Sequence, residues 1–532
     1  MFKPKKFFGL DQPLTHADHH RPKTRRDFIA QGFHTGAATV VGSSILGTGS
    51  AYADLSHLDA EFAACGIERE GNDFRIPFIC FDLAGGANIS GSNVLVGGRG
   101  GQMDFLDTNG YMKQGLPSNM LPSSLNPDPM SDGTYINTEL GLAFHADSGF
   151  LRGILEKTDA LATRPNINGA VFAARSENDT GNNPHNPMFG IAHCGARGAL
   201  MSLCGSRTSL SGGNSMAPAA LIDNAIRPTK VDRPSDVTGL VDVGDLIGLL
   251  SEEQIVAVME SMYRLSDVKM AELNAFVDRM QNQTKPDPVV CNYLAATGLA
   301  DKYADPSSLD PLADQDILDI FTNAAGGSEL DDREFRKTAS IMKMVIGGYA
   351  GAGTITMGGY DYHTGDRATG EMRDLRAGRC MGACLEYARR VGKPLMMYVY
   401  SDGSVFSNGA MDNTQGGRGK GVWTGDSQQT AGSFFLVYNP GGKPVLRNES
   451  SQQIGYMRAS GDVETSSSPV ANNVNLLVQS VMLNYLALHG MESSIEDVFL
   501  RANTRHGLGN SSSMDRLTAF GQLPGFSNET NV

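Results

Sequence analysis

An aspartate and a histidine two residues apart are the most specific candidates for chemistry in the sequence. Asp361 and His363 lie in the segment Gly-Tyr-Asp-Tyr-His at 359–363, between a predicted strand at 352–357 and a predicted helix at 371–391. A carboxylate and an imidazole on one loop can point into one cleft and bind a divalent cation. The alternative interpretation is a hydrogen bond between the two side chains in an ordinary turn.

Two further aspartates stand where predicted strands end. Asp402 follows the apolar run at 395–400, and Asp82 lies near the end of the run at 76–83. Each could supply a carboxylate ligand to the same cation, or could be a turn residue before glycine. His185, in a loop rich in asparagine and proline, is the remaining candidate metal ligand. The competing interpretation is a histidine that only makes hydrogen bonds.

Serines and basic residues in glycine-rich segments complete the candidate site. Ser90 and Ser92 follow the first predicted strand and are the candidate nucleophiles, although a hydroxyl needs an adjacent base or metal to become nucleophilic. Arg418, or Lys420, lies in the segment 407–421, which is predicted to be a glycine-rich loop, and could neutralise an anionic substrate. The spacing of that segment is not the spacing of a P-loop.

Strand-like and helix-like segments alternate along the chain and must position these residues. The predicted strands are 76–83, 169–174, 352–357, 395–400 and 433–438, and the predicted helices are 150–161, 251–280, 331–346, 371–391 and 475–488. This order predicts an α/β fold with a mostly parallel central sheet and helices on both faces. Chemistry is then expected where the strands end. We expect one large domain over 54–532, with a mainly helical insertion at about 232–347.

The N-terminal segment predicts an exported protein. Thr-Arg-Arg-Asp-Phe-Ile at 24–29 is typical of a twin-arginine signal, and Ala-Tyr-Ala at 51–53 suits cleavage before Asp54. The twin-arginine export machinery is therefore an expected partner, and 1–53 an expected cleaved signal peptide, of a periplasmic or secreted bacterial protein. Glycines make the apolar run too weak for a stable membrane span. The alternative is a chance arginine pair before a buried helix.

Composition limits the remaining possibilities. The 532 residues carry 44 Lys+Arg against 58 Asp+Glu, a net charge of −14, which argues against nucleic acid as the main partner. Apolar residues make up 40%, a globular rather than disordered composition. Seven cysteines cannot all pair within one chain, and buried thiols with one possible disulfide are expected. One Trp and 7% aromatic residues argue against a carbohydrate-binding module.

Several of these motifs, in order, resemble an exported family called domain of unknown function 1501, which is related to the alkaline phosphatase/sulfatase superfamily. The shared features are the twin-arginine leader and the segments 83–88, 144–145, 183–185, 359–363, 400–403 and 407–409. The resemblance implies an alkaline phosphatase-like fold and a metal-dependent hydrolase of phosphate or sulfate esters. It implies a divalent metal cation as cofactor and an anionic small molecule or polymer as substrate.

The chain also departs from that family. Asp402 and Gly403 replace part of the family's Ser-Glu-Phe-Gly-Arg, and its later Asp-His-Gly is missing. These departures keep a second interpretation open, a catalytically degenerate pseudoenzyme that acts as a surface or secretion-associated protein.

Overall fold

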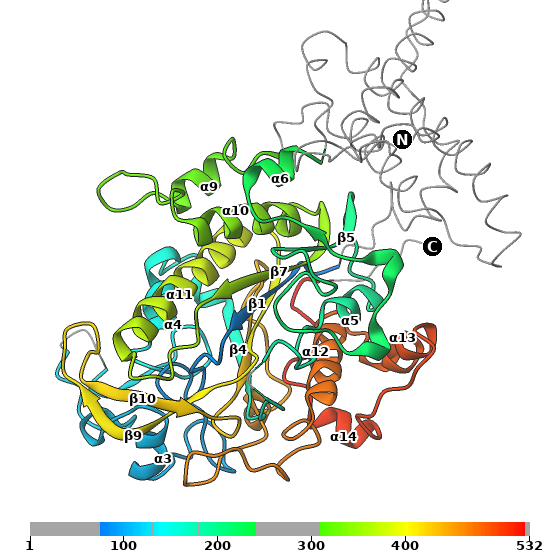
Figure 1. The fold of residues 1–532 in the computed structure, drawn as a ribbon. Helices are drawn as coiled ribbons and strands as arrows, with labels where there is room; N and C mark the ends of the chain where they lie inside the picture. The colour runs from blue at the N-terminus through cyan, green and yellow to red at the C-terminus, as the bar shows by residue number, and fades with distance from the viewer. Residues whose placement is uncertain (1–74, 129–131, 179, 241–308, 527–532) are drawn as a thin grey trace, which may run out of the picture. The chain divides into compact units, whose positions relative to one another are not determined.

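An eight-stranded β-sheet forms the centre of the computed structural model, which describes residues 75–128, 132–178, 180–240 and 309–526 (Figure 1). Its spatial strand order is β12-β4-β11-β8-β1-β7-β5-β6. The strands are β1 (Phe78–Ala84), β4 (Ile167–Phe172), β5 (Met201–Gly205), β6 (Thr229–Lys230), β7 (Ala350–Gly358), β8 (Leu395–Ser401), β11 (Ser433–Tyr438) and β12 (Gln453–Ile454).

Every pair of neighbouring strands in this sheet is parallel except the two pairs that contain β11. The α/β class and the mostly parallel sheet expected from the sequence are therefore confirmed. In the register of the sheet, Asp82 lies between Tyr400 of β8 and Thr356 of β7. Because parallel neighbours end at the same edge of a sheet, the loops after β1, β7 and β8 meet there.

Helices cover the sheet on two sides, as the alternation of elements predicts. Figure 1 shows α4, α10 and α11 on one side and α5, α12 and α13 on the other. On the second side, the alternate residues Met396, Tyr398 and Tyr400 of β8 share one buried apolar cluster with α5 and α12. The described α-helices are α3 (Thr108–Lys113), α4 (Gly149–Lys157), α5 (Met188–His193), α6 (Pro234–Thr238), α9 (Gln315–Ile320), α10 (Arg333–Ile346), α11 (Arg367–Arg390), α12 (Val474–Leu488), α13 (Ile495–Arg501) and α14 (Ser511–Asp515).

Two short antiparallel ribbons stand beside the sheet. One pairs β9 (Val405–Asp412) with β10 (Lys420–Asp426), and the other pairs β2 (Ile136–Asn137) with β3 (Phe144–His145). The expectation of a glycine-rich loop over 407–421 was therefore wrong. A two-stranded ribbon exposes much of its surface to water, so its polar composition is that of a loop although its backbone is paired.

Most predicted elements agree with the structure, and some lie outside the described residues. The predicted helix 251–280, the signal peptide and part of the proposed insertion are among the latter. The portion of that insertion from 333 onward is α10, which packs on β7. The five cysteines in the described ranges, Cys80, Cys194, Cys204, Cys380 and Cys384, are buried and free. None of the helices in these ranges combines the length and the apolar character that crossing a membrane requires.

Glycines allow α4 and α11 to pack closely. A Cβ atom added to Gly153 of α4 would lie 2.3 Å from the carbonyl oxygen of Leu375, and one added to Gly378 of α11 would lie 2.2 Å from that of Phe150. Both carbonyl groups belong to helix backbone and cannot move independently. The separation of the two helices is therefore set by these glycines.

Gly378→Ala should lower the free energy of unfolding by about 1–3 kcal/mol, the usual cost of overpacking a core. The measurement is the midpoint of urea denaturation. Gly521→Ala is the matched control, because no atom lies within 4 Å of its added Cβ, and it should change stability by less than about 0.5 kcal/mol. Equal losses in the two variants would contradict the close packing described here.

Candidate functional site

Asp361, His363 and Asp426 form a trio of side chains at the edge of the sheet where β7 ends. The Nδ1 atom of His363 is 2.5 Å from Oδ1 of Asp361 and 2.9 Å from Oδ1 of Asp426. All three potential ligand atoms lie within 4.8 Å of one another. The structure thus brings the sequence-predicted pair together and adds Asp426 from the end of β10, which the sequence analysis missed.

The geometry of the trio suits a divalent cation. Nδ1 of His363 is inaccessible to solvent and makes no hydrogen bond within the described part of the chain, although two carboxylate oxygens lie beside it. The two carboxylate oxygens are therefore not aligned to accept a hydrogen bond from an N–H group at Nδ1. A cation has no such directional requirement and needs only that the ligand atoms converge on it. One imidazole and two carboxylates are a donor set that divalent metals use. The Asp361 side chain is 67% exposed, which leaves room for further ligands.

Backbone contacts hold the trio in place. The N–H of Tyr360 donates to the carbonyl of Ala84 at 3.0 Å, which fixes the loop after β7 to the end of β1. Gly85 allows this approach, because its φ is +122° and an added Cβ would lie 2.4 Å from the nitrogen of Asp361. The N–H of Gly365 donates to the carbonyl of Trp423 at 2.8 Å and joins the same loop to β10.

Asp402 lies at the same edge of the sheet, but its carboxylate binds the turn after β1. Its Oδ1 atom accepts hydrogen bonds from the N–H groups of Gly85 at 2.8 Å and Gly86 at 3.1 Å. Its Oδ2 atom accepts one from the side-chain amide of Asn214 at 3.1 Å. Burial raises the pKa of Asp402, and the two N–H donors oppose that effect. The donor atoms of Asp402 are not among the three that converge in the trio.

Asp82 is buried next to Asp402 and binds a neighbouring loop. Its Oδ2 accepts from the N–H groups of Asn214 at 2.6 Å and Ser215 at 2.8 Å, and its Oδ1 accepts from the Ser215 hydroxyl at 3.0 Å. Burial raises the pKa of Asp82 to about 6 against these hydrogen bonds, and the charge of Asp402 adds to the increase. In this structure Asp82 holds the loop over β1 rather than joining the trio.

His185 is placed beneath this edge, against the ring of Tyr400. The two rings are stacked with centroids 5.9 Å apart. Neither ring nitrogen of His185 makes a hydrogen bond to any residue that the structure describes. Burial lowers the pKa of His185 to about 4, so the ring is neutral at pH 7. It is not grouped with the three converging ligand atoms.

The two candidate nucleophiles are buried and already hydrogen-bonded to amide oxygens. The Ser90 hydroxyl donates to the carbonyl of Thr430, and the Ser92 hydroxyl donates to the side-chain oxygen of Asn88. Among the described residues, neither hydroxyl is hydrogen-bonded to a carboxylate or an imidazole that could remove its proton. As the structure stands, neither serine has the base that nucleophilic attack needs.

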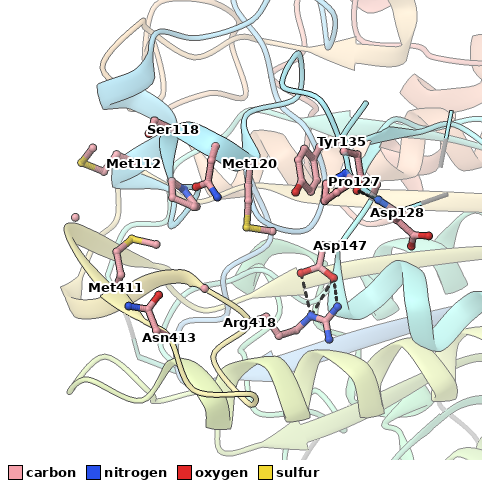
Figure 2. A pocket seen from close by; sticks show the side chains of 16 residues that line it. Met112, Ser118, Met120, Pro127, Asp128, Tyr135, Asp147, Met411, Asn413 and Arg418 are labelled. Carbon is pink, nitrogen blue, oxygen red and sulfur yellow. Dashed lines mark hydrogen bonds and ion pairs between the residues drawn. The ribbon is translucent and has the colours of Figure 1, made fainter. Parts of the chain in front are cut away.

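Arg418 lies in a pocket of about 950 Å³, where it pairs with Asp147 (Figure 2). Its Nε atom donates to both carboxylate oxygens of Asp147 at 2.9 Å. Figure 2 shows this pair at one side of the pocket, which Met120 and Met411 also line. Arg418 is partly exposed and has a φ of +57°, which is uncommon for a residue with a side chain.

Lys420 is buried, unlike Arg418. Its Nζ atom lies 2.8 Å from Oε1 of Glu371 and 3.2 Å from Oδ2 of Asp147. Burial alone would raise the pKa of Asp147, but the charges of Lys420 and Arg418 lower it below the ordinary range. Lys420 is therefore part of an internal charge network and does not face an external anion.

Lys420→Met should destabilise the protein by about 3–5 kcal/mol, because removing one partner leaves buried carboxylates without their counter-charge. Lys443→Met, at an exposed position, is the control and should change the free energy of unfolding by less than about 0.5 kcal/mol. Both values are obtained from urea denaturation at pH 7. A small loss in Lys420→Met would mean that the buried network is not a major source of stability.

His145, which neighbours Asp147, is held in its neutral form. Its Nε2 atom lies 2.8 Å from the carbonyl oxygen of Met120, and the N–H of Asp147 donates to its Nδ1 atom at 3.2 Å. The ring proton must then be on Nε2. Burial, together with the charge of Lys420, lowers the pKa of His145 to about 4.

The neutral His145 makes the protein sensitive to acid. An unfolded chain binds a proton at this residue below pH ~6.5, whereas the folded chain does so only near pH 4, so stability falls as the pH falls through that window. The contribution is about 3 kcal/mol, at about 1.4 kcal/mol per pKa unit. His145→Gln should lose less stability than the wild type between pH 6.5 and 4 in urea denaturation. Identical pH dependence in the two proteins would contradict the assignment.

Comparison of the chain with protein-family models, with curated proteins and with solved structures finds no match in any of the three. The resemblance described from the sequence motifs therefore stays a prediction.

Proposed function

We propose that the protein is an exported, divalent-metal-dependent hydrolase of phosphate or sulfate esters with an alkaline phosphatase-like fold. The observation that carries the proposal is the convergence of Asp361, His363 and Asp426 at the edge where parallel strands end. That edge is where α/β proteins of this kind place their ligands. The sequence motifs of the exported family point to the same chemistry.

The proposed roles follow from what each side chain contacts. Asp361, His363 and Asp426 would hold the cation, and Asp402 would fix the turn that supports them. A divalent cation in such a site polarises an ester oxygen and lowers the pKa of a water molecule. Because Ser90 and Ser92 are occupied by internal hydrogen bonds, we assign the attack on the ester to water.

A catalytically degenerate protein is the second candidate, and a specific observation favours it. Both serines and Lys420 are occupied by internal contacts, so three of the groups expected to act on a substrate are buried. A degenerate protein would keep the sheet and its edge loops but bind no cation at the trio. Metal binding and hydrolysis therefore separate the two candidates.

Asp426→Asn should weaken binding of Mn²⁺ or Zn²⁺ by more than about tenfold, because it removes one of three charged or imidazole donors. Isothermal titration of the purified full chain gives the affinity, and hydrolysis of p-nitrophenyl phosphate and p-nitrophenyl sulfate gives the activity. Asp366→Asn is the matched control. It removes an equal charge from an exposed residue near Asp361 that is outside the trio, and it should leave both quantities unchanged.

The two candidates predict different results in the wild-type protein. Stoichiometric metal with hydrolysis that EDTA abolishes supports the hydrolase. Absence of metal binding, together with identical behaviour of Asp426→Asn and Asp366→Asn, would refute it. Metal binding without hydrolysis of any ester tested would favour the degenerate protein.

A further inference from the structure

A second cavity, of about 570 Å³, is lined almost wholly by polar side chains. Three of these are cationic: Lys113, Arg175 and Arg458. One carboxylate, Asp462, lines the cavity with them and lies 2.5 Å from Nζ of Lys113. Positive charge is therefore in excess on the wall of this cavity, although the whole chain is acidic.

Arg175 is the residue that leaves this charge uncompensated. Arg458 pairs with Glu464 at 2.9 Å, and Lys113 pairs with Asp462. In the described part of the chain, the guanidinium of Arg175 has neither an ion pair nor a hydrogen bond to the protein. A half-buried guanidinium presents five N–H donors and readily binds a tetrahedral oxoanion.

Neutral donors share the cavity with the three cations. Gln429, Thr465 and Asn472 line it, and their side chains make no hydrogen bond to any other described residue. Two carboxamides and a hydroxyl can donate to the oxygens of an anion without adding charge. Asn472 also directly precedes Asn473, the N-cap of the 15-residue helix α12, whose N-terminus carries partial positive charge.

The cavity belongs to the same edge of the sheet as the metal-binding trio. Arg175 lies shortly after the end of β4, which runs in the same direction as β8 and β1. Gln429 is three residues beyond Asp426, so their Cα atoms are at most about 11 Å apart. One ligand could therefore reach both places.

We propose that this cavity is a binding site for a phosphate or sulfate group, with Arg175 as the main contact. Arg458 and Lys113 supply additional charge, and the three neutral side chains supply further hydrogen bonds. The affinity of the cavity for an oxoanion does not depend on the trio. The idea that a bound substrate carries one anionic group here and its reacting ester at the trio does rest on the proposed function.

The test is isothermal titration of the full chain with sodium sulfate at low ionic strength in the presence of EDTA. Wild-type protein should bind sulfate, and Arg175→Gln should weaken binding roughly 10-fold to 100-fold, the loss expected for hydrogen bonds to a charged group. Arg227→Gln removes the same charge at an exposed position after β5 and should bind like the wild type. Arg458→Gln is a second variant, with an expected loss of several-fold.

The outcomes separate this proposal from the metal site. Sulfate binding that persists in EDTA and in Asp426→Asn but is weakened in Arg175→Gln supports the cavity. Binding that disappears with EDTA, or that Arg175→Gln leaves intact, overturns it, because the anion then binds elsewhere. No binding to the wild type also overturns it, while leaving the hydrolase proposal open.

A competition experiment shows whether the cavity binds a free anion or an anionic group that is part of a larger molecule. A sulfated disaccharide that displaces sulfate at a lower concentration than inorganic phosphate does would show that the cavity prefers an esterified group. Displacement by inorganic phosphate alone would show that it binds the free anion. Either result supports an oxoanion site at Arg175, and both measurements use the same folded protein.

Discussion

The carboxylate of Asp402 is the constraint on which the edge of the sheet depends. It directly follows the buried strand β8 and accepts hydrogen bonds from the turn after β1 and from the loop that carries Asn214. Asp82 binds that same loop from the neighbouring strand. Two buried carboxylates of like charge are unfavourable by themselves, and the backbone N–H groups that they order stabilise them. The geometry of the candidate site follows from this arrangement.

Local patterns were sufficient to predict part of the structure. Long apolar runs such as 395–400 identify central strands because they are buried on both faces. The short strand β5 was missed because serine and glycine interrupt its apolar residues. Asp361 and His363 were found as a pair because they share one loop. Asp426 carried no such signal, because its role depends on how a separate hairpin docks.

The basic residues show why spacing along the sequence cannot reveal which cations form ion pairs with carboxylates. Arg418 and Lys420 are two residues apart in a glycine-rich segment, which predicts two free cations. Arg418 lies in the turn before β10, where its φ of +57° accompanies a side chain that lines a pocket. Lys420 begins β10 and is buried, and there Asp147 and Glu371 neutralise it. Arg175, which attracted no attention in the sequence, is the one of the three cavity cations that has no ion pair with a described residue. The net charge of the chain is thus negative, whereas the charge on the wall of the cavity is positive.

The hairpin of β9 and β10 also determines when the three proposed metal ligands come together. In a nascent or unfolded chain only Asp361 and His363 are close together. Two ligands alone bind a cation weakly. The third donor arrives only when the ribbon has paired and docked beside the loop after β7. High-affinity capture of a cation would therefore be coupled to the last stages of tertiary assembly, and the ion would in turn favour the docked ribbon.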